Sequence, residues 1–286
     1  MEKLQAAIAK ARESREEAAP AAKAEAPAPT TGRDPSDAAR GAAQPAAPAQ
    51  PSAWSAVPEM TFRKKQLRRN RVMSWEGGVK AAPYDMLRTR FLKEMSRQGW
   101  KRLAITSPTS GCGKTTTCAN LAFSLSRQTD LRTIIFDCDL RRSALAKTLG
   151  QSGTTNMHEV LEGRVDFAKH AVRIGDNVLL GLSHRSAPDP SELLQSRRAA
   201  EVLDQIEQQY QPDVMIFDMP PLLVNDDTIG FSGKVDCAML IAMAELSTIE
   251  DVDVAEKELA AHTNVLGVVL NRCRYSAGQY GYDYEY

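Results

Sequence analysis

The sequence lacks any apolar run long enough to cross a membrane, since such a helix needs about 20 residues. The apolar stretch 238–244 (AMLIAMA) has the length of a buried strand. We also expect no secretory leader, because Met1-Glu2-Lys3 leads into an Ala-rich stretch that contains several charged residues. The five cysteines are odd in number and show no CxxC spacing, and only four histidines are present. We therefore expect no disulfide framework and no zinc site, and we expect a soluble protein of a reducing cytoplasm.

Net charge is missing as well, because 36 Lys and Arg balance 36 Asp and Glu. Residues 1–60 hold 20 Ala and 8 of the 15 Pro, a mixture that cannot bury enough apolar area to offset its ordering entropy. We expect a flexible, disordered extension over 1–72, with one short helix over 2–19. The following stretch, 73–274, is long enough for a single domain with one sizeable core.

A basic run of six cations lies just before this domain: Arg63, Lys64, Lys65, Arg68, Arg69 and Arg71. One interpretation is a solvated hinge. The other is attachment to an anionic membrane face, at ~1 kcal/mol per basic residue, or to an acidic partner segment. No nucleic-acid partner is predicted, because the domain has no net charge and no aromatic residues are interleaved with these cations.

From residue 101, apolar segments of strand length alternate with helical stretches. The predicted strands are 101–106, 132–137, 177–183, 213–219, 237–244 and 264–271. Asp189 and Pro190 mark the start of an amphipathic helix that we expect to run to about Tyr210. This alternation predicts an α/β fold whose mostly parallel sheet has helices on both faces.

The first predicted strand runs into SPTSGCGKTTT and then into a convincing helix, the context that makes a phosphate-binding loop credible. Gly111 and Gly113 remove side chains where phosphate oxygens approach, and Lys114 supplies a positive charge. The usual first glycine of such loops is Pro108 here. The residues expected to bind the nucleotide are Ser110, Gly111, Cys112, Gly113, Lys114, Thr115 and Thr116.

Two further strands end in carboxylates. Asp137 ends the strand 132–137, Asp139 lies two residues beyond it, and Asp218 lies at the end of the strand 213–219. Ligands of open parallel sheets lie beyond the carboxyl ends of the strands, so these carboxylates should converge on the same mouth as Lys114. Mg²⁺ prefers oxygen ligands and keeps several waters, which predicts a metal site made by Thr115, Asp137 and Asp218.

Together with PDPSELLQS, GVVLNR and a tyrosine-rich C-terminus, these motifs resemble the bacterial tyrosine kinases of the capsule and exopolysaccharide type, a branch of the P-loop NTPases. The resemblance covers about residues 75–286. It implies an ATP- and Mg²⁺-dependent tyrosine autokinase that controls polysaccharide polymerisation and export. It also implies a membrane-spanning co-polymerase adaptor at the inner face of the plasma membrane, self-association, and a phosphotyrosine phosphatase. Lys114, Asp137, Asp139 and Asp218 would be catalytic, with Asp137, aided by Asp139, accepting the tyrosine proton.

The segment 275–286 contains five of the chain's seven tyrosines, interleaved with Gly, Ser, Asp and Glu. Such a segment has no core in which to bury its rings, so we expect a flexible tail that is the phosphorylation site. The predicted acceptors are Tyr275, Tyr280, Tyr282, Tyr284 and Tyr286. An aromatic tail without phosphorylation is the alternative.

Two departures from the resembled family keep other functions open. Its ring-forming E-x2-R-x2-R motif is reduced here to Arg88 in the segment 82–88, and Cys112 replaces a common Glu. Cys112 is either a tolerated small residue or an oxidant sensor. The competing functions are a nucleotide-switch ATPase of the partition or division-site type and a catalytically weak nucleotide-binding scaffold. The first would carry a lysine at the position of Thr109, and it leaves the tyrosine tail unexplained.

Overall fold

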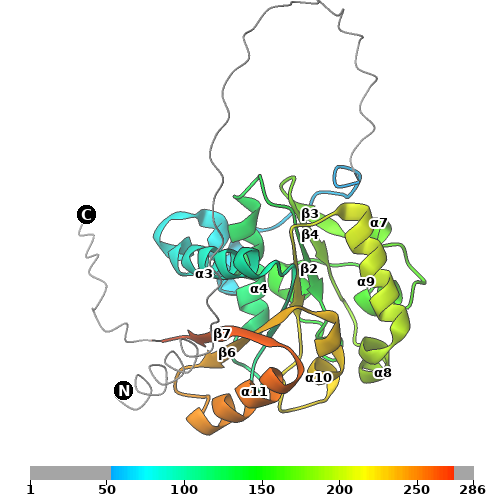
Figure 1. Cartoon of the computed structure of the whole chain (residues 1–286). Helices are drawn as coiled ribbons and strands as arrows, with labels where there is room; N and C mark the ends of the chain where they lie inside the picture. Colours follow the sequence, from blue (N-terminus) through cyan, green and yellow to red (C-terminus); the bar gives the residue numbers. More distant parts are fainter. Residues whose placement is uncertain (1–52, 274–286) are drawn as a thin grey trace, which may run out of the picture. The chain divides into compact units, whose positions relative to one another are not determined.

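Seven strands form one sheet in the computed structural model, which describes residues 53–273 (Figure 1). They lie in the order β3-β4-β2-β5-β1-β6-β7, and all neighbours are parallel except β3 with β4. Their bounds are β1 Arg102–Thr106, β2 Thr133–Asp137, β3 Val172–Ile174, β4 Val178–Gly181, β5 Val214–Asp218, β6 Cys237–Met243 and β7 Asn264–Asn271. The six predicted strands are confirmed. The additional strand, β3, has three residues that are mostly half-buried, too few to give a sequence pattern.

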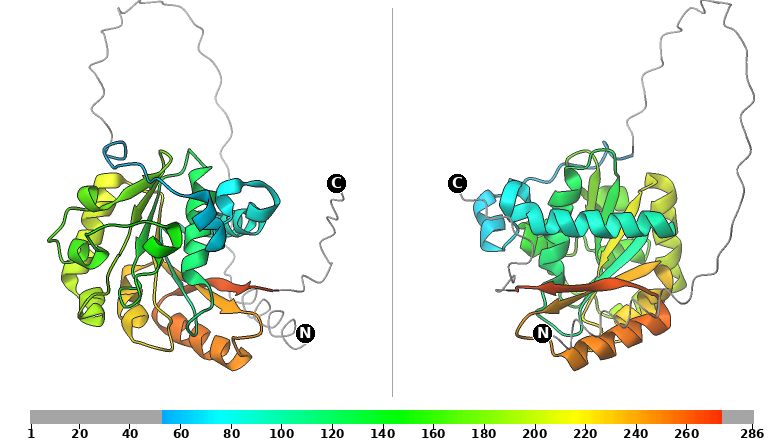
Figure 2. Two further views of the ribbon diagram at one scale, coloured as in Figure 1. Left: turned by 180° about the vertical axis from the view of Figure 1, so that it is seen from behind. Right: turned by 60° about the vertical axis from the view of Figure 1, so that its left-hand side comes forward.

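Helices cover both faces of the sheet, as predicted (Figures 1 and 2). One face carries α3 (Gly78–Gln98), α4 (Lys114–Ser126) and α5 (Leu145–Leu149), and the other carries α9 (Arg197–Tyr210), α10 (Asp227–Phe231) and α11 (Ile249–His262). The shorter elements are α2 (Lys64–Arg69), η1 (Ser74–Glu76), α6 (Met157–Leu161), α7 (Phe167–His170), α8 (Pro190–Gln195) and η2 (Ser232–Lys234). Among residues 53–273, no helix combines the length and apolar character needed to cross a bilayer.

Two separate apolar clusters result, because alternate residues of the central strands point to opposite faces. Ile135 and Ile216 pack with α3 and α4, whereas Ile134 and Phe217 pack with α9 and α11. The central strands are therefore buried on both sides, which fixes their carboxyl ends relative to one another.

The helix expected from Asp189 to Tyr210 is two helices. It begins at Pro190 as predicted, but α8 ends at Gln195 and α9 starts at Arg197. Ser196 between them is extended, with ψ 148°, and its hydroxyl accepts a hydrogen bond from the backbone N–H of Ala199. A serine that caps a new helix therefore interrupts an otherwise helical pattern.

Residues 53–72 were expected to belong to the extension, and here the structure corrects the boundary. Trp54 is 3% exposed, and its indole N–H donates to the carbonyl of Tyr210 at 2.8 Å. Backbone hydrogen bonds join Pro58 and Met60 to Arg173 of β3. Single apolar residues that are widely spaced in a polar segment make these contacts, so average composition did not reveal them.

Replacing Trp54 with Ala should lower the free energy of unfolding by roughly 3 kcal/mol, because a large buried ring and its hydrogen bond are both lost. Trp54→Phe, which keeps most of the apolar area, should lose about half as much. Urea denaturation followed by circular dichroism measures both. Values within experimental error of the parent chain would mean that residues 53–60 are not part of the folded unit.

Candidate functional site

The phosphate-binding loop occupies residues 107–113, between the end of β1 and the start of α4. Gly111 and Gly113 have φ values of +86° and +94°, in the left-handed region that favours glycine. The loop therefore turns directly into the N-terminus of α4, whose first N–H groups have no partner within the helix. Lys114, the first residue of α4, is 7% exposed. The predicted order of strand, loop and helix is confirmed, and it forms a ready anion site.

The last strand of the sheet holds this loop in shape. The side-chain amide of Asn271, at the end of β7, donates to the carbonyl oxygen of Cys112 at 2.8 Å. A Cβ atom added at Gly113 would lie 2.2 Å from the same amide nitrogen. The loop conformation thus depends on glycine at 113 and on a residue 159 positions from Cys112. Sequence spacing did not indicate this tie.

The thiol of Cys112 is enclosed by neighbouring polar groups. Its Sγ atom lies 3.3 Å from the carbonyl oxygen of Thr109 and 3.5 Å from the hydroxyl of Ser247, and the residue is fully buried. Cys112 contributes its backbone to the loop while its side chain packs beneath it. Because the thiol is not exposed, an oxidant-sensing role has no support from this geometry.

The predicted carboxylates meet beside the loop. Asp137 and Asp218 end the neighbouring parallel strands β2 and β5, are paired in register, and are both fully buried. Asp139 lies two residues beyond β2, is 4% exposed, and accepts a hydrogen bond from the N–H of Arg142 at 3.2 Å. The convergence expected from parallel-sheet topology is therefore observed.

Burial dominates the protonation of this group. It raises the pKa of Asp137 well above its ordinary value, and the nearby charges of Asp218 and Asp139 raise it further. Burial raises the pKa of Asp218 to about 6, against the opposing attraction of Lys114. Burial also raises the pKa of Asp139, again opposed by Lys114. The site therefore holds several carboxyl groups away from solvent, where their negative charges repel one another. A bound divalent cation would reduce this repulsion.

The oxygens available here suit Mg²⁺. Within residues 53–273, both carboxylate oxygens of Asp218 and one of Asp137 are buried without a hydrogen-bond partner. That same part of the chain contains no group of three or more His, Cys, Asp or Glu side chains able to hold a metal by themselves. A cation there would complete its shell with water, the hydroxyl of Thr115 in the first turn of α4, and phosphate oxygens, as Mg²⁺ does in nucleotide sites.

A second cluster fixes the loop that follows β2. The guanidinium of Arg141 donates to both carboxylate oxygens of the fully buried Asp227, at 2.7 and 2.9 Å. The hydroxyl of Ser191 lies within hydrogen-bond distance of the Asp227 carboxylate and also of the Asp226 carboxylate, at 2.8 Å from the latter. These contacts connect the Asp139 loop to α8 and α10. Their partners are far apart along the chain, so sequence reasoning missed the cluster, although Ser191 lies in the quoted motif PDPSELLQS.

Arg88, the remnant of the ring-forming motif, is engaged inside the chain. Its guanidinium donates to the carbonyl and the hydroxyl of Ser124 in α4, and its side chain is 12% exposed. Asp85 at the preceding motif position accepts from Ser124 and Arg127. These contacts join α3 to α4, and they leave little of the Arg88 side chain exposed to a neighbouring subunit.

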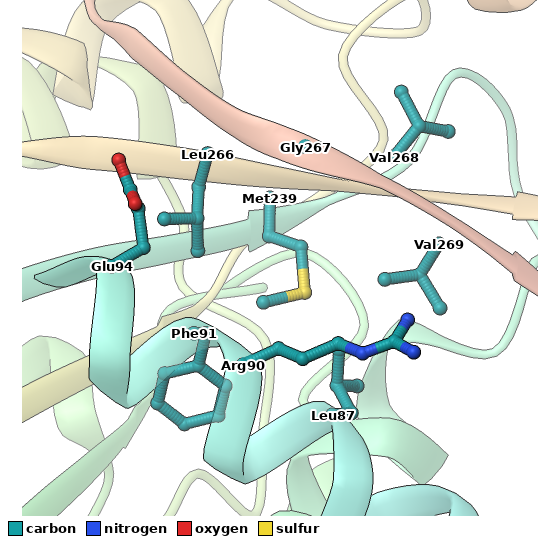
Figure 3. Close-up of a pocket in the computed structure, with 9 residues that line it drawn as sticks. All are labelled: Leu87, Arg90, Phe91, Glu94, Met239, Leu266, Gly267, Val268 and Val269. Carbon is teal, nitrogen blue, oxygen red and sulfur yellow. The ribbon is translucent and has the colours of Figure 1, made fainter. Parts of the chain in front are cut away.

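A pocket of about 190 Å³ lies elsewhere, between α3 and β7 (Figure 3). Leu87, Phe91 and Met239 give it an apolar lining, with Arg90 and Glu94 at its border. Sites for nucleotide-sized ligands have volumes of roughly 300–1,000 Å³. No residue of the phosphate loop lines this pocket, so it is separate from the nucleotide site.

Two predicted features lie outside the described residues: the helix over 2–19 and the five tyrosines of 275–286. Their roles stay predictions. Of the residues predicted to bind the nucleotide, Ser110 lies half-buried within the loop, and Thr116 lies half-buried in the first turn of α4. The structure thus brings together the predicted loop and carboxylate residues.

Comparison with known proteins gives consistent matches. The sequence model of the CobQ/CobB/MinD/ParA nucleotide binding domain matches residues 103–283. The tyrosine-protein kinase wzc of Salmonella typhi is 32% identical over 190 residues, which is 64% of this chain and 26% of that protein. The chain thus spans about a quarter of the length of this relative. The tyrosine-protein kinase CpsD of Streptococcus pneumoniae is 28% identical over 66% of this chain and 83% of its own length.

Among solved structures, the kinase domain of the Escherichia coli tyrosine kinase ETK has a TM-score of 0.62 and 26% identity. The match covers 72% of this chain and 82% of that one. The septum site-determining protein MinD of Pyrococcus horikoshii shares the fold, with a TM-score of 0.52 and 23% identity. The P-loop α/β fold expected from the sequence is therefore confirmed.

Gly113→Ala should weaken nucleotide binding at least tenfold, because its new methyl group meets the Asn271 amide and its backbone must keep φ at +94°. Gly233→Ala is the matched control, since a Cβ atom at Gly233 has open space around it. Titration with a fluorescent ATP analogue measures both variants. Unchanged affinity in Gly113→Ala would contradict the described loop geometry.

Asp218→Asn should stabilise the metal-free, nucleotide-free protein at pH 7. The folded-state pKa of Asp218 is about 6, above its ordinary 3.8, so the unfolded chain loses the proton first as pH rises. The free energy of unfolding of the parent chain should therefore fall between about pH 4 and pH 6, by on the order of 3 kcal/mol. The Asp218→Asn variant should not show this fall in the free energy of unfolding, because its amide does not ionise.

Thermal denaturation between pH 4 and pH 7.5 measures the difference between the two proteins, which should grow with pH. Asp176→Asn is the control, because it makes the same substitution at a side chain that is 98% exposed. A gap between parent and Asp218→Asn that stays constant with pH would contradict the raised pKa.

Proposed function

The chain belongs to the CobQ/CobB/MinD/ParA family of nucleotide-binding domains and, within it, to the bacterial tyrosine kinases of capsule and exopolysaccharide synthesis, and from this premise we propose that it is an ATP- and Mg²⁺-dependent protein tyrosine autokinase. Its acceptors are the tyrosines of 275–286. The observation that carries the proposal is the meeting of Lys114, Asp137 and Asp218 beside the phosphate loop.

The residues divide the work of phosphoryl transfer, which needs positioning and charge neutralisation more than covalent chemistry. The loop N–H groups and Lys114 bind the β- and γ-phosphates and stabilise the charge of the transferring group. Thr115, Asp137 and Asp218 would hold Mg²⁺, which neutralises phosphate charge when bound. The metal-binding role of the two carboxylates is supported by the buried oxygens of Asp137 and Asp218 that have no hydrogen-bond partner.

In the proposed reaction, a tyrosine hydroxyl oxygen bonds to the γ-phosphorus of ATP while the bond from that phosphorus to the bridging oxygen breaks. ADP leaves with the electron pair. The phenolic proton passes to Asp137, whose burial makes it more basic than an ordinary carboxylate. The nearby charge of Asp139 raises the pKa of Asp137 further, and so helps Asp137 to accept the proton.

We propose that the tail is phosphorylated by a neighbouring copy. The internal contacts of Arg88 favour a transient encounter over assembly through the ring-forming motif. The proposed partners are a membrane-spanning co-polymerase adaptor, which would place the protein at the inner face of the plasma membrane, and a phosphotyrosine phosphatase. The proposed role is control of exopolysaccharide or capsule polymerisation and export, by analogy with the named relatives.

The test mixes two full-length variants, neither of which can phosphorylate its own tail. Lys114→Met keeps the tail and should lose activity at least about 100-fold, whereas a variant with all five tail tyrosines changed to Phe keeps the site. Mixed with Mg-ATP, the second chain should phosphorylate the tail of the first, as mapped by mass spectrometry. Lys169→Met, on the exposed side of α7, should behave as the parent.

The same assay separates the alternatives, and it is repeated with cytoplasmic segments of candidate adaptors. ATP hydrolysis without phosphotyrosine under all conditions would replace the kinase with a nucleotide-switch ATPase. Nucleotide binding with neither activity would leave a scaffold. Phosphate on residues 275–286 of the parent chain, but never on the Lys114→Met chain of the mixture, would contradict the transfer between copies.

A further inference from the structure

The basic run before the domain is part of the folded structure. Leu67 of α2 and Val72 are fully buried, and the Asn70 side chain donates to the carbonyls of Lys147 and Thr148 in α5. The side-chain amide of Asn120 in α4 donates to the carbonyl of Arg71 and accepts from the N–H groups of Met73 and Ser74. The run is therefore fixed against α4 and α5, which excludes the interpretation of a solvated hinge.

Helical geometry sorts the cations of this run into two sets. Lys64 and Arg68 lie over the ring of Trp75, and Arg68 also pairs with Glu76. Residues 65 and 69 are one turn apart on the side of α2 opposite Leu67. The outward set is exposed and forms no ion pair within residues 53–273: Arg63, Lys65, Arg69 and Arg71. We call these four residues the basic platform.

We propose that the basic platform binds the tyrosine-phosphorylated segment 275–286 of the same chain. This deepens the proposed function and rests on it, because the kinase reaction would create the ligand. Each phosphate adds about −1.5 to −2 charges and three strong acceptor oxygens. Single exposed ion pairs contribute little, so binding requires several phosphates at once. The unphosphorylated segment carries only Asp283 and Glu285 as acidic side chains.

The tail can reach this platform easily. β7 ends at Asn271, which contacts the loop just before α4, and Arg71 contacts Asn120 six residues along α4. At 1.5 Å per residue, this separation along the helix is about 9 Å. The thirteen residues 274–286 can span up to about 45 Å when extended. In both views of Figure 2, α2 and the end of β7 lie on the same side of the domain.

Covalent attachment favours the tail over other anionic partners, because it gives the segment a high effective concentration near the platform. An anionic bilayer has no comparable link in the described structure. Binding would hold a phosphorylated tail on its own domain and so keep the reaction product out of a neighbour's site. The phosphorylation state of the tail would thus determine whether the tail is bound to the platform.

The test uses a synthetic peptide of residues 274–286 with its five tyrosines phosphorylated, titrated into the full Lys114→Met chain so that no enzymatic phosphate competes. Fluorescence anisotropy should show binding that weakens as salt rises. The unphosphorylated peptide should bind at least tenfold more weakly. Changing Arg63, Lys65, Arg69 and Arg71 together to Gln should also reduce affinity at least tenfold.

A control with the same change in charge removes four exposed cations on the opposite face, three of them paired with carboxylates, by changing Arg164, Lys169, Arg197 and Arg198 to Gln. It should leave peptide affinity within about twofold of the parent, and circular dichroism confirms that both variants fold. Equal losses in both variants, or equal binding of both peptides, would overturn the proposal. Platform-dependent binding of phosphatidylglycerol vesicles without phosphopeptide binding would overturn it in favour of a membrane.

This outcome is independent of the kinase assay. The peptide carries its phosphates from synthesis, so a chain without kinase activity still gives a valid binding result. Conversely, an active kinase whose platform does not bind the phosphopeptide would leave the proposed function intact and remove only this inference.

Discussion

Two carboxyl groups held side by side and out of water are the constraint on which the rest of this structure depends. Asp137 and Asp218 end adjacent strands in register, with no solvent to separate their charges. Such an arrangement is unfavourable by itself, as the raised pKa values of both groups show. It is tolerated because the strands below them are buried on both faces, and a divalent cation bound beside them would supply the missing positive charge.

The site is held in place by polar contacts from distant parts of the chain. Asn271 fastens the phosphate loop, Arg141 fastens the loop that carries Asp139, and Asn120 fastens the basic segment to the phosphate-binding helix. Each of these side chains satisfies backbone or carboxylate groups that would otherwise lose hydrogen bonds on burial. A few buried polar residues therefore couple the nucleotide loop, the acidic loop and the N-terminal segment into one framework.

The sequence predicted the central elements well because their signals are local. Buried parallel strands appear as short continuous apolar runs, and the phosphate loop needs glycine and lysine at fixed spacing, as Gly113 and Lys114 show. Predictions failed where long-range contacts decide the structure. Trp54 belongs to the core through a partner far along the chain, and Ser196 breaks a helix by capping the next one. The Arg141–Asp227 pair is also invisible in the sequence, since nothing local relates its members.

The tie between Asn271 and the phosphate loop also concerns the order in which the protein is made. The loop emerges early in synthesis, whereas β7 is the last strand of the sheet to leave the ribosome. A nascent chain that already contains Gly113 and Lys114 still lacks the side chain that closes the loop beneath them. The loop therefore gains the contact that holds its described shape only after nearly the whole domain has been translated.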